Sequence, residues 1–183
     1  MKPLKLTVVI ILVIVVLLLV IPLFLPETVE VSGNRCMKAS PGVVFNQVNV
    51  LKNRENWSPF NSDTTMELVY SGNDSGVGAK YSWSGEKVGN GNLEIVKSVP
   101  GKYIETKLDF GPQGSAGGEW RFRSKGDSTC VTWTIKIYNL QYPFGRWLGL
   151  MMKNGMKPVI DKALVKMKNA VENNSAENPK AKP

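Results

Sequence analysis

The stretch Glu119–Tyr138 reads EWRFRSKGDSTCVTWTIKIY, and its pattern decides the fold class of the chain. Apolar and polar residues alternate on both sides of Gly126-Asp127, a pair that favours a tight turn. In the first arm Trp120 and Phe122 share one face. In the second arm the residues that share one face are Val131, Trp133, Ile135 and Ile137. This alternation predicts a β-hairpin that buries one face and exposes the other.

The same kind of signal recurs upstream of this hairpin. From Thr64 onward, short strand-like segments are separated by turn signals, and the predicted strands are Met66–Tyr70, Ala79–Ser84, Val88–Val99 and Lys102–Phe110. Asn90-Gly91 lies inside the third of these strands, where it predicts a β-bulge. Thr28–Lys38 also alternates and adds a strand at the start of the domain. Short strands joined by tight turns indicate an antiparallel meander of about seven strands.

Two parts of the chain have helical periodicity instead. Ser40-Pro41 is a typical helix start, and the short helix that it opens has the apolar stripe Val44, Phe45, Val48 and Leu51. Near the end, apolar residues recur at helical spacing over Phe144–Met156 and again over Val159–Val171. We expect Pro158 to separate two helices, because proline interrupts the backbone hydrogen bonds of a helix. The polar residues 173–183 are predicted to form a disordered tail.

Before the predicted sheet lies Leu6–Leu25, which reads LTVVIILVIVVLLLVIPLFL and has no charged residue. A helix of this length, at about 1.5 Å per residue, spans the roughly 30 Å hydrocarbon core of a bilayer. A cleaved signal peptide has a shorter apolar run and a small-x-small cleavage site, and Ile21–Pro26 contains no Ala-x-Ala pattern. A buried core helix is a third reading, but soluble cores rarely need so long an uncharged run. We interpret the segment as an uncleaved signal anchor.

The charges around the anchor predict its orientation. Lys2 and Lys5 precede the apolar run, two acidic residues follow it, and the next basic residue is Arg35. Because basic residues stay on the cytoplasmic side, the amino terminus should be cytoplasmic and Glu27–Pro183 should be periplasmic or extracellular. The predicted organisation is therefore a cytoplasmic start and transmembrane anchor in residues 1–26, one domain in residues 27–172, and the tail.

Composition excludes several kinds of chemistry. The chain has no histidine, which removes Ser-His-Asp and Cys-His catalysis and histidine-ligated metals. Two cysteines are too few for a zinc site, and the glycine-rich stretches Gly72–Gly78 and Gly111–Gly118 lack the G-K-[ST] ending of a phosphate loop. We predict no catalytic residue, no metal and no cofactor, and the sequence carries no convergent acid–base pair.

The predicted exported part is basic. Two of the 23 lysines and arginines precede the anchor, so 21 remain against 15 acidic residues, a net charge of +6. That surplus suits an anionic membrane surface, although a soluble basic surface is the simpler interpretation. The basic residues are dispersed and no nucleic-acid motif is present, so we expect no nucleic-acid partner.

The strongest chemical feature of the sequence is apolar. Large aromatic residues and methionines fall on predicted core faces, and methionine-rich helices adapt to irregular apolar partners. Two interpretations stay open, a ligand cavity and an ordinary core, and for Trp57 and Phe60 a plug at one end of the core is equally compatible. The residues that would line a cavity are Trp57, Phe60, Tyr81, Trp83, Phe110, Trp120, Phe122, Trp133, Trp147, Met151 and Met152.

Four segments, in this order, resemble a known family. They are KASPGVVF at Lys38–Phe45, NWSPF at Asn56–Phe60, VGAKYSW at Val77–Trp83 and CVTW at Cys130–Trp133. The first resembles the family's NAPPEKVF opening and the second its WSPW segment. Residues 28–172 are thereby similar to the START/Bet v 1-like SRPBCC superfamily, often described as polyketide cyclase/dehydrase and lipid transport. No single motif is specific, but their order is.

The resemblance implies an α+β helix-grip fold, in which a curved antiparallel sheet wraps a long C-terminal helix around an apolar cavity. Members bind lipids, sterols, polyketides or hormones, and a minority catalyse cyclisation or dehydration. No catalytic residue carries over, because members that catalyse often use histidine or a charged pair in the cavity. The first hypothesis is therefore a membrane-tethered binding domain for a hydrophobic small molecule or lipid.

Two alternatives remain beside that hypothesis. One is a polyketide cyclase or dehydratase that positions its substrate in the cavity, which a buried carboxylate or arginine there would support. The other is a ligand-free interaction module, which a cavity too small for a ligand would support.

The resemblance also implies a disulfide. In the resembled fold the first and last strands are antiparallel neighbours, and pairing Val29–Lys38 with Thr129–Tyr138 brings Cys36 close to Cys130. Both cysteines are out of phase with the apolar residues next to them and should face outward. Neighbouring residues of paired strands lie within disulfide reach, and an exported domain meets an oxidising environment. The alternative is two unpaired thiols on the sheet surface.

Overall fold

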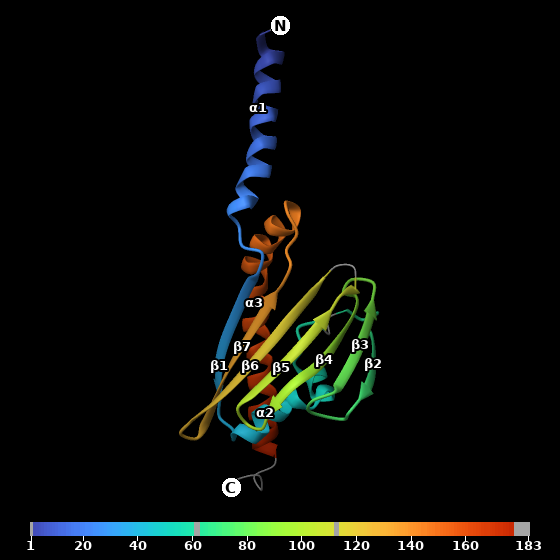
Figure 1. Cartoon of the computed structure of the whole chain (residues 1–183). Helices are drawn as coiled ribbons and strands as arrows, with labels where there is room; N and C mark the ends of the chain where they lie inside the picture. Colours follow the sequence, from blue (N-terminus) through green and yellow to red (C-terminus); the bar gives the residue numbers. More distant parts are fainter. Residues whose placement is uncertain (1, 61–62, 112–113, 178–183) are drawn as a thin grey trace.

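The computed structural model describes residues 2–60, 63–111 and 114–177. A helix, α1 (Lys2–Val20), and a short 3-10 helix, η1 (Ile21–Phe24), precede a single seven-stranded sheet (Figure 1). The strands are β1 (Val29–Met37), β2 (Glu67–Gly72), β3 (Ala79–Gly85), β4 (Gly89–Val99), β5 (Tyr103–Asp109), β6 (Ser115–Lys125) and β7 (Ser128–Ile137). The remaining helices are α2 (Pro41–Asn49), the 3-10 helix η2 (Leu51–Asn56) and α3 (Phe144–Glu177).

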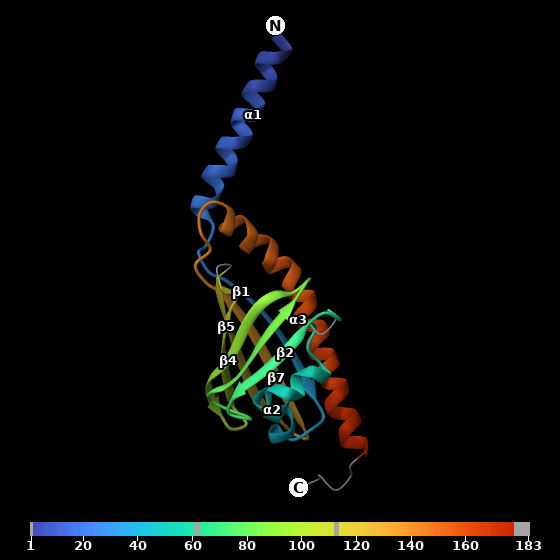
Figure 2. The ribbon, with the colours of Figure 1, turned by 90° about the vertical axis from the view of Figure 1, so that its right-hand side faces the viewer.

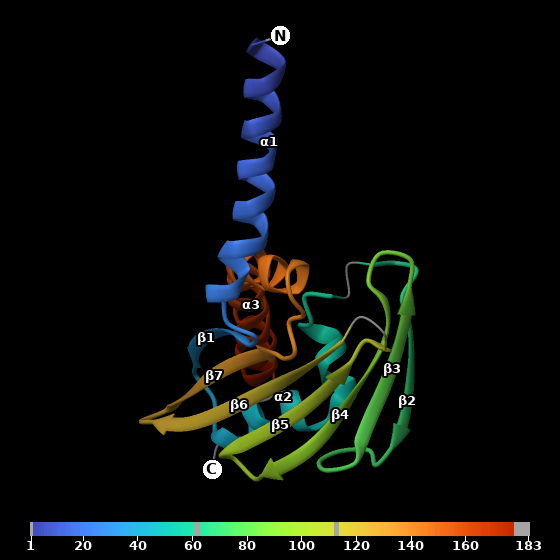
Figure 3. The same ribbon diagram turned by 45° about the horizontal axis from the view of Figure 1, so that its top comes forward.

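All neighbouring strands are antiparallel, and their order across the sheet is β1-β7-β6-β5-β4-β3-β2. The helix α3 packs along β1, while α2 and η2 lie inside the curve of the sheet (Figure 3). This arrangement confirms the predicted α+β helix-grip fold and the predicted number of strands. Alternation places the core residues on one face of each strand, as in β7, where the side chains of residues 129–135 alternate between buried and half-buried positions.

The predicted bulge at Asn90-Gly91 is wrong. Both residues pair regularly with β3, Asn90 with Ser84 and Gly91 with Trp83. The irregularity in β4 lies instead between Ile95 and Lys97, where the register against β5 shifts. A bulge increases the local twist of a strand, so this position contributes to the curvature that turns β2 and β3 away from β1 (Figure 3).

Glycine allows α3 to approach the sheet closely. A Cβ atom on Gly33 of β1 would lie 2.7 Å from Cγ2 of Ile160 and 2.8 Å from Oδ1 of Asp161, both on α3. Such distances are shorter than van der Waals contact, so any side chain at this position would push the helix outward. The buried residues Ile160, Leu164 and Met167 then cover the core.

The prediction of two C-terminal helices is wrong, because α3 continues through Pro158 as one helix of 34 residues. The side chain of Pro158 is exposed, so the carbonyl that loses its helical partner can bind water, and the helix bends along its length (Figure 2). The helix ends at Glu177, beyond the predicted boundary at residue 172, and residues 178–183 of the predicted tail lie outside the described residues.

The helix α1 projects away from the sheet (Figure 1). The apolar stretch Lys5–Phe24 is 20 residues long, and only 6% of it is buried, so the reading as a buried core helix is wrong. Its length and composition suit a membrane span and a signal sequence alike.

The first and last strands are neighbours, and their register places Cys36 directly opposite Cys130. The two Cα atoms are 3.9 Å apart, and the two sulfur atoms are joined in a disulfide. Cys36 is exposed and Cys130 is half-buried, which agrees with the outward orientation that alternation predicts. The bond links positions 94 residues apart in the sequence.

Candidate functional site

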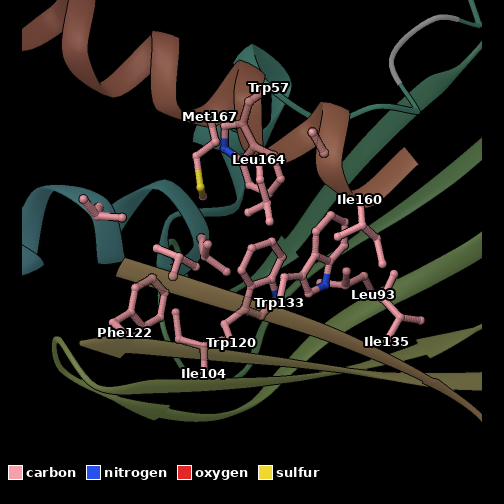
Figure 4. Packing of buried hydrophobic residues seen from close by; sticks show 14 of the residues in the cluster. Trp57, Leu93, Ile104, Trp120, Phe122, Trp133, Ile135, Ile160, Leu164 and Met167 are labelled. Carbon is pink, nitrogen blue, oxygen red and sulfur yellow. The ribbon is translucent and has the colours of Figure 1, made fainter. Parts of the chain in front are cut away.

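Three tryptophans fill the space between the sheet and α3 (Figure 4). Trp120 and Trp133 face each other across β6 and β7, and their rings stack with centroids 4.3 Å apart. Trp57, which follows η2, meets both rings edge-on at 5.6 and 6.2 Å. The Nε1–H of Trp57 donates to the carbonyl of Gln47 at 3.1 Å and so fixes this side chain to α2. At most 3% of each of these side chains is exposed.

A phenylalanine pair extends this cluster towards the β6–β7 turn. Phe122 packs edge-on against Phe45 of α2 with ring centroids 5.4 Å apart. Of the residues predicted to line a cavity, four are therefore buried among one another and their neighbours, namely Trp57, Trp120, Phe122 and Trp133. Trp57 is therefore part of the buried core.

A second aromatic group is half-buried rather than closed. Tyr70 of β2, Tyr81 and Trp83 of β3, and Phe110 after β5 form a continuous row with successive ring centroids 5.9, 5.9 and 5.6 Å apart. Tyr81 pairs with Leu93, which is fully buried, and paired residues of antiparallel strands point to the same face. The aromatic row therefore lines the core face of the sheet on its β2–β3 side.

The place of Trp83 in the row depends on Gly91. A Cβ atom at Gly91 would lie 2.2 Å from Cζ2 of Trp83, so the indole rests directly on the glycine backbone. Opposite Trp83 on β2 the register places Leu68. The sequence motif Asn90-Gly91 thus provides room for an aromatic ring, which is a different role from the predicted bulge.

A buried cation lies among these rings and was not predicted from the sequence. Arg54 of η2 is only 6% exposed, and its Cζ lies 5.3 Å from the Trp57 ring centroid and 5.9 Å from that of Trp120. Its Nε and Nη1 atoms are buried without a hydrogen-bond partner. An arginine in a polar connector is normally a surface residue, so the only sequence signal was its position three residues before Trp57.

Next to Arg54, Glu55 accepts a hydrogen bond of 2.5 Å from the hydroxyl of Tyr70. Burial, and secondly this hydrogen bond, raise the pKa of Tyr70, so the hydroxyl stays protonated as a donor at neutral pH. The Tyr70 hydroxyl thereby connects the aromatic row to η2.

The remaining predicted lining residues do not join either aromatic group. Phe60 is 40% exposed. Trp147, Met151 and Met152 lie on the first turns of α3, where Trp147 donates from Nε1 to the carbonyl of Leu18 in α1 at 3.1 Å. Met151 is 71% exposed. These three residues therefore belong to the end of the molecule next to α1.

The surface of the domain has two notable hollows. One, of about 430 Å³, is basic and is lined by Lys97, Lys102, Tyr103, Arg121, Phe122 and Arg123. The other, of about 480 Å³, lies between β1 and α3 and is lined by Glu30, Val31, Ser32, Lys153, Asn154, Lys157 and Pro158. Neither hollow is lined by the aromatic row.

The only buried carboxylate in the described part of the chain, Asp63, has a structural role. Its oxygens accept hydrogen bonds from the backbone N–H groups of Thr65, Lys87 and Val88 and from the Thr65 hydroxyl, so it ties the turn between β3 and β4 to the segment before β2. The hydroxyl bond from Thr65 is the main cause that lowers its pKa to about 2. Among the described residues, no group of three or more Cys, Asp or Glu side chains could hold a metal ion.

Solved structures share this fold at low sequence identity. Protein SA2116 from Staphylococcus aureus is 16% identical with a TM-score of 0.62, covering 82% of this chain and 97% of its own. TTHA0849 from Thermus thermophilus is 19% identical with a TM-score of 0.56, covering 80% and 99%. Ara h 8.0201 is 10% identical with a TM-score of 0.54, also covering 80% and 99%. At these identities the similarity shows the fold alone.

Comparison with curated proteins finds no match. A family model does match, over residues 28–172, and its description is polyketide cyclase/dehydrase and lipid transport. The matched region begins one residue before β1 and ends within α3, so it covers the whole helix-grip domain. The chain therefore belongs to the polyketide cyclase/dehydrase and lipid transport family of the START/Bet v 1-like SRPBCC superfamily.

Proposed function

We propose that this domain binds a hydrophobic small molecule or lipid on its aromatic row, and that α1 holds the domain at a membrane. The observation that carries the proposal is the half-buried state of Tyr70, Tyr81, Trp83 and Phe110. Burial of apolar surface stabilises a protein by about 25 cal/mol per Å². Rings that stay partly in contact with water do not contribute this free energy in full. An apolar ligand on the row would recover that free energy.

The tryptophan core supports this site from behind. Because Trp57, Trp120 and Trp133 already contact one another, they provide a rigid wall and leave the row as the adaptable part. Family membership agrees with the proposal, since the family description includes lipid transport.

Membrane attachment is the second part of the proposal. The exposed stretch Lys5–Phe24 would cross the bilayer as a signal anchor, with the amino terminus in the cytoplasm and the domain in the periplasm or outside the cell. A lipid ligand would then be available at the surface on which the domain is anchored.

Native mass spectrometry of the full chain released from membranes tests the binding proposal. We expect a co-purified apolar molecule on the wild-type protein and a reduced occupancy in Trp83→Ala, which removes the central ring of the row. The matched control is Val69→Ala on β2, whose side chain is 65% exposed and lies on the opposite face from Tyr70. Equal occupancy in both variants, or an empty wild-type protein, contradicts the aromatic row as a site.

Two other functions are each favoured by one observation. The closed tryptophan core favours a ligand-free interaction module, which the empty wild-type protein would indicate. The buried guanidinium of Arg54 favours an enzyme, because a buried cation can stabilise an oxyanion. Arginine is a poor general acid or base, however, and Asp63 is held by structural hydrogen bonds, so binding is the stronger proposal.

A further inference from the structure

The guanidinium of Arg54 is the least satisfied polar group of the described core. Its Nε and Nη1 atoms are buried and have no hydrogen-bond partner, and the Nε1 of Trp120 is likewise buried and unpaired. Arg54 and Trp120 are neighbours, because the Arg54 Cζ lies 5.9 Å from the Trp120 ring centroid. Three donors without acceptors are therefore gathered in one region.

Arginine side chains are not deprotonated in proteins, so burial of this side chain means burial of a charge. Stacking on the faces of Trp57 and Trp120 offsets part of the cost of burial, since aromatic faces attract cations. Stacking provides no acceptor in the guanidinium plane, so the N–H groups of Nε and Nη1 stay unpaired. A buried charge of this kind is normally paired, so the arrangement favours an anionic partner.

Arg54 lies where the closed core meets the aromatic row. Its neighbour Glu55 is bound to the hydroxyl of Tyr70, the first ring of the row. Burial is the main cause that raises the pKa of the Tyr70 hydroxyl, and the charge of Arg54 partly opposes this rise. An amphiphile with its apolar part on the row could therefore place a headgroup at Arg54.

We propose that Arg54, assisted by the Nε1–H of Trp120, binds the oxyanion headgroup of a single-chain amphiphile whose apolar chain lies along Tyr70, Tyr81, Trp83 and Phe110. This inference rests on the proposed function and specifies the ligand class. A guanidinium offers the planar pair of donors that matches a carboxylate or a phosphate. The headgroup is the carboxylate of a fatty acid or the phosphate of a lysophospholipid.

Photo-crosslinking of the full chain in phosphatidylcholine nanodiscs tests this inference. A diazirine-bearing palmitic acid should label the peptide that contains Tyr81 and Trp83 in a saturable manner. Palmitic acid and lysophosphatidic acid are the competitors with an anionic headgroup, methyl palmitate is the neutral competitor, and acetate is the headgroup alone. We expect palmitic acid, lysophosphatidic acid or both to compete about tenfold better than methyl palmitate, and acetate not to compete.

Variants identify the side chain that causes the preference for the acid over the ester. Arg54→Gln should lose the preference for the acid over the ester while methyl palmitate competes as before, and Arg54→Lys should retain only part of the preference. Trp120→Phe keeps the ring and removes the N–H, so it tests the site even if Arg54→Gln does not fold. Arg121→Gln is the matched control, because this arginine lies on the outer face and its side chain is 60% exposed.

The outcomes separate the two proposals. If methyl palmitate competes as well as palmitic acid in the wild-type protein, or if Arg54→Gln and Trp120→Phe both retain the acid preference, the anion site is wrong and the aromatic row stands. If labelling of the Tyr81–Trp83 peptide is not saturable, the proposed function itself is wrong.

A second inference rests on a separate observation, the contact between α3 and the end of α1. The hydroxyl of Tyr142 donates to the carbonyl of Leu19 at 2.8 Å, and Trp147 donates to that of Leu18. In an α-helix the carbonyl of Leu18 would accept from residue 22, but Pro22 has no N–H. Trp147 therefore supplies the donor that the apolar helix lacks.

Arg146 completes this contact. Its Nη1 donates to the carbonyl of Pro22 at 2.9 Å, and its Nη2 is paired with Glu27. Leu18 lies six residues before the end of the apolar stretch at Phe24, so its carbonyl is about 10 Å inside that end. Trp147, which is hydrogen-bonded to that carbonyl, must therefore enter the polar boundary of any bilayer that α1 crosses.

The outer face of the same turns of α3 is apolar and exposed. Phe144, Leu148 and Met151 follow at helical spacing and are 82%, 54% and 71% exposed, and nearby Phe24 is 84% exposed. The exposed lysines Lys153 and Lys157 follow two and six residues after Met151. In Figure 2 this part of α3 leaves the sheet and reaches the base of α1. Aromatic residues followed by lysines are typical of a membrane interface.

We infer that the face formed by Phe144, Leu148 and Met151 lies in the lipid interface of the bilayer that α1 spans, so the domain is held against the membrane in one orientation. This inference rests on the proposed membrane attachment. Continuity of the stripe with the apolar helix favours lipid over a protein partner. The lysines then lie at the depth of the headgroups.

Spin labels on the full chain in liposomes test this inference. Met151→Cys, Ile14→Cys and Val69→Cys each place one label on an exposed position, because the native cysteines are bonded to each other. We expect the labels at positions 151 and 14 to be accessible to oxygen and protected from a water-soluble nickel complex. The control label at position 69 should be accessible to the nickel complex.

If the label at position 14 is protected and that at position 151 is not, the domain is only tethered and the interfacial inference is wrong. If neither is protected, the membrane proposal itself is wrong. Protection at position 151 that disappears when the protein is diluted in the liposomes identifies a second copy as the partner and overturns the inference.

Discussion

Single residues decide how the aromatic row is built. A Cβ atom at Gly91 would lie 2.2 Å from the Trp83 ring and 2.8 Å from the carbonyl oxygen of Asp109. Gly91→Ala should therefore displace the indole, weaken ligand binding and destabilise the domain by about 1–3 kcal/mol. Thermal unfolding and lipid occupancy of the full chain measure both effects.

Gly155→Ala is the control for this substitution. Gly155 lies on α3 with open space around its Cβ position, so alanine there should be neutral or stabilise by up to about 1 kcal/mol. A Gly91→Ala variant as stable and as well occupied as the wild type would mean that Trp83 has another position available.

At this scale the sequence predicts the face of a residue better than its surroundings. Alternation correctly placed Trp120 and Trp133 on the buried face of their strands. Alternation does not distinguish a ring in a closed cluster from one in an open row, because that depends on which side chains the other strands and helices bring. Arg54 lies in an irregular connector without periodicity, so its burial follows only from the packing of η2.

At the scale of elements, the β3–β4 hairpin depends on Asp63. This carboxylate accepts from the backbone N–H groups of Lys87 and Val88, and its pKa is lowered to about 2 from 3.8. The lowered pKa means that the folded state favours the ionised form. Its contribution to stability is complete above about pH 4 and is lost as the pH falls towards 2.

Asp63→Asn should consequently lower the unfolding temperature at pH 7, because the amide replaces one acceptor with a donor that faces N–H groups. The difference from the wild type should shrink between pH 4 and 2, where the wild-type carboxyl also becomes protonated. Asp74→Asn changes an exposed carboxylate in the β2–β3 turn and should have little effect. A difference for Asp63→Asn that is constant with pH would contradict the charge-based role.

Helix boundaries show where local rules are insufficient. Proline was expected to end the first C-terminal helix, and the local energetics favour that outcome. The helix continues through Pro158 nevertheless: Ile160, Leu164 and Met167 after it are buried in the core, and the partly buried Met156 before it packs against the same cluster. The strands were predicted more reliably because each carries its own turn signals.

At the scale of the whole molecule, the disulfide joins the first strand to the last. Closing 94 residues should stabilise the domain by about 2–4 kcal/mol. With the domain exported as proposed, the purified protein should contain no free thiol before reduction, and reduction should lower its unfolding temperature. A Cys36→Ser/Cys130→Ser variant should match the reduced protein and be insensitive to reductant. Two free thiols in the purified protein would contradict both the bond and the exported location.

The orientation of the chain in the membrane is the last prediction, and it follows from the charges on either side of α1. Lys2 and Lys5 precede the apolar run, whereas Glu27 and Glu30 follow it. A reporter enzyme that is active only outside the cytoplasm, fused after Pro183, should therefore be active. Lys2→Glu together with Lys5→Glu should reduce that activity because the difference in basic charge is lost.

Lys153→Glu together with Lys157→Glu is the matched control for this experiment. These lysines lie more than 120 residues after α1, so their replacement should not affect its insertion. The two glutamates should only weaken contact with anionic lipid. Activity of a cytoplasm-only reporter at the same fusion point would show that the orientation is opposite to the predicted one. It would also place Cys36 and Cys130 in a reducing compartment, so the topology and the state of the disulfide must agree.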